Sequence, residues 1–177
     1  MAIAKRKKKF FDVEIPIIGK ETQVLAYDLK ELDKTNLSYD LSRILKGKNI
    51  LLKTEISVTE NKAVANPKEI RLLPFFIRKT MRKGISYIED SFSVESKDAR
   101  GTIKPFLITR KKVSRKIRDS LRKKTKETII DYVKEKESEE IFRDILRSIL
   151  QKRLGAVLKK IYPLSMSEIR IFKIEKK

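Results

Sequence analysis

A run of cations over Arg110–Lys126 carries the clearest chemistry in this sequence. Its letters, RKKVSRKIRDSLRKKTK, contain ten Lys and Arg residues and a single acid, Asp119. Val113, Ile117 and Leu121 recur every four residues, which predicts a helix with the cations on its outer surface. Clustered cations bind phosphate groups, because each contact releases counterions condensed on a nucleic acid. The run therefore predicts nucleic-acid binding; the alternative is a solvated charged face.

The order of charges along this helix favours the same interpretation. Acids follow the cations, beginning with Glu127 and Asp131. A helix has partial positive charge at its N-terminus, so acids there stabilise it by roughly 0.3 to 1 kcal/mol each and cations oppose it. Like charges four residues apart, such as Arg118 and Arg122, add repulsion. A phosphate-rich partner would compensate for both effects.

The composition excludes several classes of function. The chain has 177 residues, with 44 Lys plus Arg, 24 Asp plus Glu and a formal net charge of +20. It contains neither Cys nor His, so it has no thiolate nucleophile, disulfide, Cys/His zinc site or imidazole acid or base. No acidic cluster suits a metal, and no apolar run approaches the roughly 18 residues of a membrane span. We therefore expect an intracellular protein that is no enzyme and has no metal, no cofactor and no membrane partner.

Three further basic segments add candidates for RNA contact. Residues 1–9 form a basic arm without an apolar period, which we expect to be disordered until it meets RNA. The others are the segment around Arg78–Lys83 and the single residue Arg100. The predicted RNA-binding residues are Lys5, Arg6, Lys7, Lys8, Lys9, Arg78, Lys79, Arg82, Lys83, Arg100, Arg110, Lys111, Lys112, Arg115, Lys116, Arg118, Arg122, Lys123 and Lys124.

Apolar periodicity predicts strands in the first two thirds of the chain and helices in the last third. Strands are expected at 10–18, 22–29, 49–59, 85–96 and 101–109, and short helices at 38–48 and 74–83. Leu25, Tyr27 and Leu29 are expected to share one face of a strand, with Tyr27 in the core, and Phe75, Phe76 and Met81 are expected to face the core. Ser114 or Thr109 is expected to cap the basic helix. A helix from Ser138 should break near Ser148, where a second capping box follows, and a short strand should close the chain.

Four segments resemble a known family in the same order. They are KKFFD at 8–12, FIRKTMRKGISYIED at 76–90, IKPFLITRK at 103–111 and KIYPLSMSEIR at 160–170. Together they resemble the small-subunit ribosomal protein one family of archaea and eukaryotes, also called the three-A-e family. The chain departs from the family pattern in Phe10 and Phe11, in the DLKELD turn at 28–33 and in the spacing of IRDSLRK. It lacks the long basic arms of eukaryotic members, and these departures point to an archaeal-type or divergent member.

The resemblance implies a structural constituent of the small ribosomal subunit. The expected fold is α+β, with a small β-barrel core flanked by helices in one globular domain over residues 10–177. It implies a cytoplasmic place on the platform near the mRNA exit, with rRNA and neighbouring platform proteins as partners. Whether mRNA itself is contacted stays open. The rival hypothesis is a free-standing nucleic-acid-binding regulator or chromatin protein.

Overall fold

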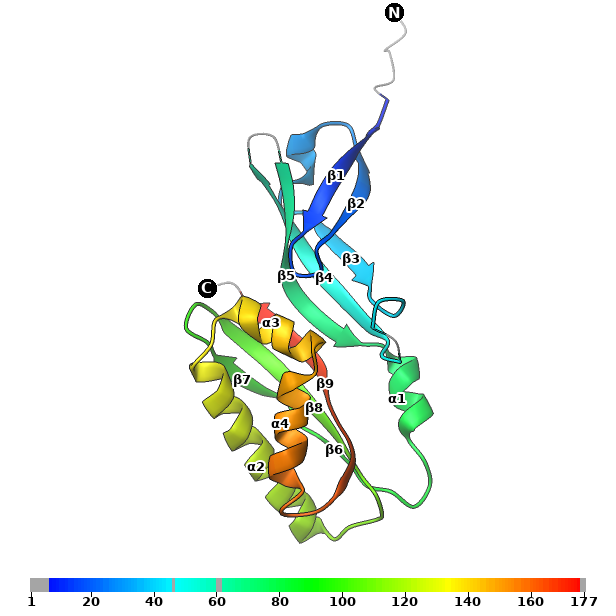
Figure 1. The fold of residues 1–177 in the computed structure, drawn as a ribbon, viewed down its shortest axis with the longest axis vertical. Coiled ribbons are helices and arrows are strands. Elements are labelled where there is room, and N and C mark those ends of the chain that lie inside the picture. Colours follow the sequence, from blue (N-terminus) through cyan, green and yellow to red (C-terminus); the bar gives the residue numbers. More distant parts are fainter. Residues whose placement is uncertain (1–6, 46, 60–61, 176–177) are drawn as a thin grey trace, which may run out of the picture. The chain divides into compact units, whose positions relative to one another are not determined.

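The computed structural model describes residues 7–45, 47–59 and 62–175, which divide into two compact units (Figure 1). The first unit holds residues 1–39 and 52–68, and the second holds residues 40–51 and 69–177. The fold class is α+β, as predicted. Its elements are β1 (Lys9–Ile15), β2 (Lys20–Ala26), the 3-10 helix η1 (Leu29–Leu32), β3 (Asn36–Asp40), β4 (Ile50–Thr59), β5 (Lys62–Leu72), α1 (Pro74–Thr80), β6 (Tyr87–Glu89), β7 (Phe92–Glu95), β8 (Arg100–Thr109), α2 (Arg115–Lys134), α3 (Ser138–Leu146), α4 (Ile149–Leu158) and β9 (Leu164–Glu175).

In the first unit, β1 and β2 form an antiparallel hairpin, and β1 also runs parallel to β5. Val13 and Ile15 are buried, and they set the inward face of β1. The hairpin register pairs Phe10 with Leu25, on the opposite face. Leu25 and Tyr27 are therefore exposed, and the prediction that Tyr27 lies in the core was wrong.

The helix predicted at 38–48 does not form. The chain instead continues the strand β3 to Asp40, and β3 pairs with β4. The Asp40 carboxylate accepts hydrogen bonds from the Ser42 amide and hydroxyl at 2.8 and 2.6 Å. This local turn competes with helix formation, and a single turn follows in which the Leu45 amide donates to the Leu41 carbonyl.

The second unit is built on β8, which pairs antiparallel with β6, β7 and β9. Figure 1 shows α2, α3 and α4 lying on one face of these strands. The rings of Phe142 on α3 and Phe172 on β9 are 4.8 Å apart between centroids, and both side chains are buried. β9 has 12 residues, so the last third is less helical, and its final strand longer, than predicted.

The strands are hydrogen-bonded in the order β2-β1-β5-β9-β8-β6, with β3 attached through β4 and β7 attached to β8. Among the described strands, no pair joins β2 to β6, so the predicted barrel is not confirmed. The single domain over residues 10–177 stays a prediction. Most of the predicted arm, residues 1–6, lies outside the described residues, and Lys9 is the first residue of β1.

A glycine allows β8 and β9 to approach closely. Gly101 lies inside β8 opposite Ile174. A Cβ atom added to it would lie 2.7 Å from the Lys173 carbonyl oxygen. The turn between β7 and β8 precedes it, where the Ser96 amide donates to the Ala99 carbonyl. Glycine is therefore required here by the neighbouring backbone.

The start of α3 is capped from a distant turn. The Ser138 amide donates to Asp98 Oδ1 at 2.8 Å, and the Ser138 hydroxyl donates to the same carboxylate. Burial alone would raise the pKa of Asp98, but the hydrogen bonds from Ser138 and Ser96 together lower it below its usual value. The ionised carboxylate is thus favoured by folding.

We expect this cap to weaken in acid. Because the folded-state pKa of Asp98 is lowered, its contribution to stability is present above the unfolded pKa of about 3.9 and is lost as pH falls further. Asp98→Asn keeps a capping oxygen but does not titrate. Thermal unfolding from about pH 6 down to about pH 2 should show a larger loss for the wild type than for the variant. Parallel curves would contradict this assignment.

Candidate nucleic-acid interface

The basic helix is confirmed as α2, although it begins at Arg115 rather than at Arg110. Hydrogen bonds at the end of β8 hold the preceding residues in another conformation. Thr109 Oγ1 lies 2.9 Å from the Ser86 carbonyl oxygen and 2.7 Å from the Lys111 carbonyl oxygen. The Val113 amide donates to Ser86 Oγ at 3.2 Å. The chain therefore reaches α2 through a bonded loop.

In the first turn of α2, the protein itself supplies neither a side-chain cap nor an acid to offset the cations. Ser114 stands at the N-cap position but makes no side-chain capping bond, and Thr109 bonds elsewhere, so neither predicted cap is formed. The first turn contains no acid. Burial begins only at Leu121, which leaves every side chain from Arg115 to Ser120 at least partly exposed. The predicted conflict between cations and the helix dipole is thus present.

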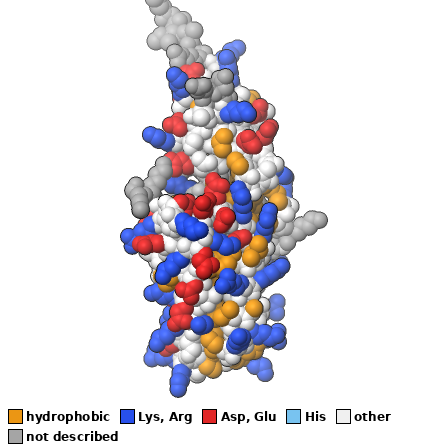
Figure 2. All heavy atoms as spheres, turned by 60° about the vertical axis from the view of Figure 1, so that its left-hand side comes forward, with side chains coloured by type: hydrophobic (Ala, Val, Ile, Leu, Met, Phe, Trp, Pro, Cys, Tyr) orange, Lys and Arg blue, Asp and Glu red, His pale blue; other side chains and the backbone are white. Residues whose placement is uncertain are grey.

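All ten cations of Arg110–Lys126 are exposed. Two of them have a carboxylate nearby: Arg122 lies 4.0 Å from Asp90 and 3.7 Å from Asp119, and Lys124 lies 3.0 Å from Glu127. Such exposed pairs contribute about 0 to 1 kcal/mol. Within the described part of the chain, the other eight cations have no carboxylate within 4.0 Å. Figure 2 shows Lys and Arg side chains around the lower end of the second unit, where α2 begins.

The second predicted patch spans the end of α1 and the residues that follow it. Arg78 and Lys79 lie in the helix and Arg82 and Lys83 just beyond it, and all four are exposed. The helix ends at Thr80, earlier than predicted. Ile77 is its buried residue. Phe75 and Met81 are 55% and 40% exposed, so the prediction that they face the core was wrong.

The remaining predicted residues are scattered. Lys7, Lys8 and Lys9 are exposed in the first unit, where Lys8 Nζ lies 5.3 Å from the centroid of the Tyr27 ring. Lys5 and Arg6 lie outside the described residues. Arg100 is exposed, but its cross-strand neighbours are Glu95 and Glu175. It therefore adds little to a cationic surface.

Two hollows in the second unit bring separate cations together. One, of about 660 Å³, is lined by Lys79 and Arg82 from the second patch and by Arg110. The other, of about 500 Å³, is lined by Arg110 together with Lys48, Lys152 and Lys159. Lys48, Lys152 and Lys159 were not among the residues predicted from the sequence to bind RNA. Lys152 and Lys159 are seven residues apart, which places them on one helix face, but nothing local connects them with Arg110.

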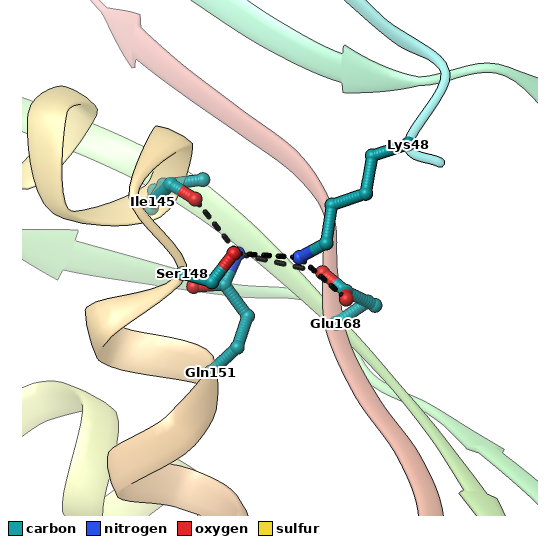
Figure 3. A network of polar contacts seen from close by, with 5 residues as sticks. All are labelled: Lys48, Ile145, Ser148, Gln151 and Glu168. Atoms are coloured by element: carbon teal, nitrogen blue, oxygen red, sulfur yellow. Dashed lines mark hydrogen bonds and ion pairs between the residues drawn. The ribbon is translucent and has the colours of Figure 1, made fainter. Parts of the chain in front are cut away.

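Lys48 is held by a polar network of residues that line the second hollow (Figure 3). Its Nζ atom donates to Ser148 Oγ at 2.8 Å and lies 2.7 Å from Glu168 Oε1. Gln151 Nε2 donates to the Ile145 carbonyl oxygen at 3.0 Å. The predicted break between two helices at Ser148 is confirmed, but Gln151 bonds to Ile145 and makes no capping box.

The described residues offer no other obvious site. No three His, Cys, Asp or Glu side chains gather among them in a way that could hold a metal ion. None of the described helices is both long and apolar enough to cross a membrane. What the second unit offers chemically is a set of exposed, largely unneutralised cations.

Comparison with known proteins points to one family. The profile described as the Ribosomal S3Ae family matches residues 4–177. The small ribosomal subunit protein eS1 of Pyrobaculum aerophilum is 29% identical over 192 residues, which cover 99% of this chain and 85% of the relative. The protein of the same name from Nanoarchaeum equitans is 25% identical over 180 residues, covering 96% and 90%.

Proposed function

Because this chain belongs to the Ribosomal S3Ae family, we propose that it is a structural constituent of the small ribosomal subunit that binds rRNA. Its relatives are named small ribosomal subunit protein eS1. A family of ribosomal proteins implies a component of the ribosome in the cytoplasm and not an enzyme, as the sequence predicted. Archaeal relatives also agree with the predicted archaeal type.

The observation that carries rRNA binding is the start of α2. It presents unneutralised cations at the positive end of a helix, an arrangement that costs stability unless a polyanion receives it. Cations at the end of α1 and just beyond it add to this charge, because Lys79 and Arg82 line the same hollow as Arg110. Contacts of this kind read charge and shape, because a folded RNA helix hides its base edges in a deep groove.

The family resemblance supports a more specific place for the protein in the small subunit. We place the protein on the platform near the mRNA exit, beside other platform proteins, with residues 10–177 acting as one rRNA-binding domain. We also propose that the protein contacts mRNA there. A map of the small subunit from the source organism would locate each of these neighbours.

A high-salt wash tests the proposed function. A tagged copy of the full chain, expressed in the source organism, should remain with small subunits through a wash that removes loosely bound proteins. The control is the same protein added to finished subunits, which should wash off. A free-standing regulator would be lost in both cases and would bind purified DNA and RNA equally at low salt, and this result would refute the proposal.

A further inference from the structure

We infer that the second unit holds a segment of unpaired RNA in a cationic groove, separate from the outer surface of α2. This inference rests on the proposed rRNA binding. It adds that the groove binds unpaired RNA, whereas the outer surface of α2 binds folded RNA. The groove consists of the two hollows described above, which share Arg110, Ser165 and Met166 in their linings. They therefore adjoin at the start of β9.

The charge of the groove favours an anionic ligand. Six of the described cations line it: Lys48, Lys79, Arg82, Arg110, Lys152 and Lys159. The one acid among its described lining residues is Glu168, which is paired with Lys48 at 2.7 Å. In the part of the chain that the structure describes, the other five cations have no carboxylate within 4.0 Å. A concave surface of one charge concentrates the field inside it.

The apolar side of the groove indicates which polyanion fits. Phe75 lines the larger hollow and is 55% exposed, and Ile108 and Met166 lie in the same lining. An exposed aromatic ring among cations is the arrangement on which unpaired bases stack while their phosphates meet the charges. A duplex cannot use it, because its bases are stacked inside and its phosphates lie on a convex surface. An acidic peptide would use the charges but leave the ring uncovered.

Unpartnered polar groups in the smaller hollow agree with a ligand that has polar edges. Gln151 and Ser167 both line it, and within the described residues Gln151 Oε1 and Ser167 Oγ have no hydrogen-bond partner. Gln151 is only 5% exposed. A buried polar atom without a partner destabilises the protein, because it has lost its hydrogen bonds to water. A ligand can reach either atom only if its side chain turns toward the hollow, and the amino and carbonyl groups of a base would then supply the missing partners.

The test compares two RNA probes by fluorescence anisotropy with the full chain. One probe is an unstructured uridine oligonucleotide of about ten nucleotides, and the other is a closed RNA hairpin. Phe75→Ala should weaken binding of the oligonucleotide by about 5- to 150-fold, the range for loss of one base stack. The double variant Lys152→Glu with Lys159→Glu should lower the salt slope for the oligonucleotide by about 1 to 2. Phe10→Ala, an exposed ring outside both linings, is the matched control and should bind as wild type.

Each result decides the inference. Oligonucleotide binding that is unchanged in both groove variants would overturn it, and so would an equal loss of hairpin binding, since the groove would then not select unpaired RNA. Displacement of the oligonucleotide by polyglutamate as readily as by unlabelled RNA would show a site for acidic peptides instead. The proposed function fails separately: Arg115→Glu with Arg118→Glu on α2 should lose the hairpin and keep most oligonucleotide binding. If that variant keeps the hairpin, the α2 interface is wrong while the groove stands.

Discussion

Arg115→Glu with Arg118→Glu should make the free protein more stable and abolish its incorporation into small subunits. Both side chains are exposed at the start of α2, and neither has a carboxylate within 4.0 Å among the described residues. Acids at the positive end of a helix stabilise it by roughly 0.3 to 1 kcal/mol each. At this chain length, about 1 kcal/mol raises the melting temperature by about 2 to 4 °C. Loss of two phosphate contacts should lower the salt slope for an rRNA fragment by about 1.4 to 1.8.

The control changes the net charge equally but at other places. Lys30→Glu with Lys134→Glu also reverses two exposed cations, one in η1 and one in the last turn of α2. A cation is favourable at a helix C-terminus, so this pair should lower stability slightly and leave incorporation intact. Melting by circular dichroism and co-sedimentation with salt-washed subunits measure both effects. If the α2 variant sediments like wild type, its cations are merely solvated.

Phe172→Ala should have the largest effect on folding. Its ring is 2% exposed and packs against Phe142, so it joins β9 to α3. Removing a buried Phe side chain costs about 3 to 5 kcal/mol, a large part of the 5 to 15 kcal/mol that typically holds a domain folded. Urea unfolding measures the loss. Phe10→Ala, at 70% exposure, should change stability by less than about 0.5 kcal/mol, and an equal loss in both variants would show that the Phe172 contact is not formed.

The helices and strands that were predicted well from the sequence are those with a strong local pattern of apolar residues. In α2 and α3 the apolar residues repeat at helical spacing, and nearly every second residue of β4 is buried, as its alternation indicated. Exposure of the cations was also predictable, because unpaired charges are rarely buried. The side of β2 that faces the core was not predictable, because Leu25 and Val24 are both apolar and both suit an inward position. The register with β1, not the side chains of β2, decides between them.

The parts that sequence could not predict depend on distant residues. The cap of α3 comes from Asp98, 40 residues before Ser138, whereas capping signals in a sequence are local. The spacing of the leucines in residues 38–48 predicted a helix. The start of this segment instead forms the end of β3, which pairs with β4. The groove joins Lys48, Arg110 and Lys152 only after the sheet has formed, so no spacing in the sequence relates them.

The position of β9 in the sheet has a consequence for how the chain is made. Translation runs from the N-terminus, so β5 and β8 leave the exit tunnel before the 12-residue strand that hydrogen-bonds to both of them. Until that strand emerges, the two edges it will join present unsatisfied amides and carbonyls to other nascent chains. A chaperone that covers these two edges would therefore be needed until β9 is made and pairs with both of them.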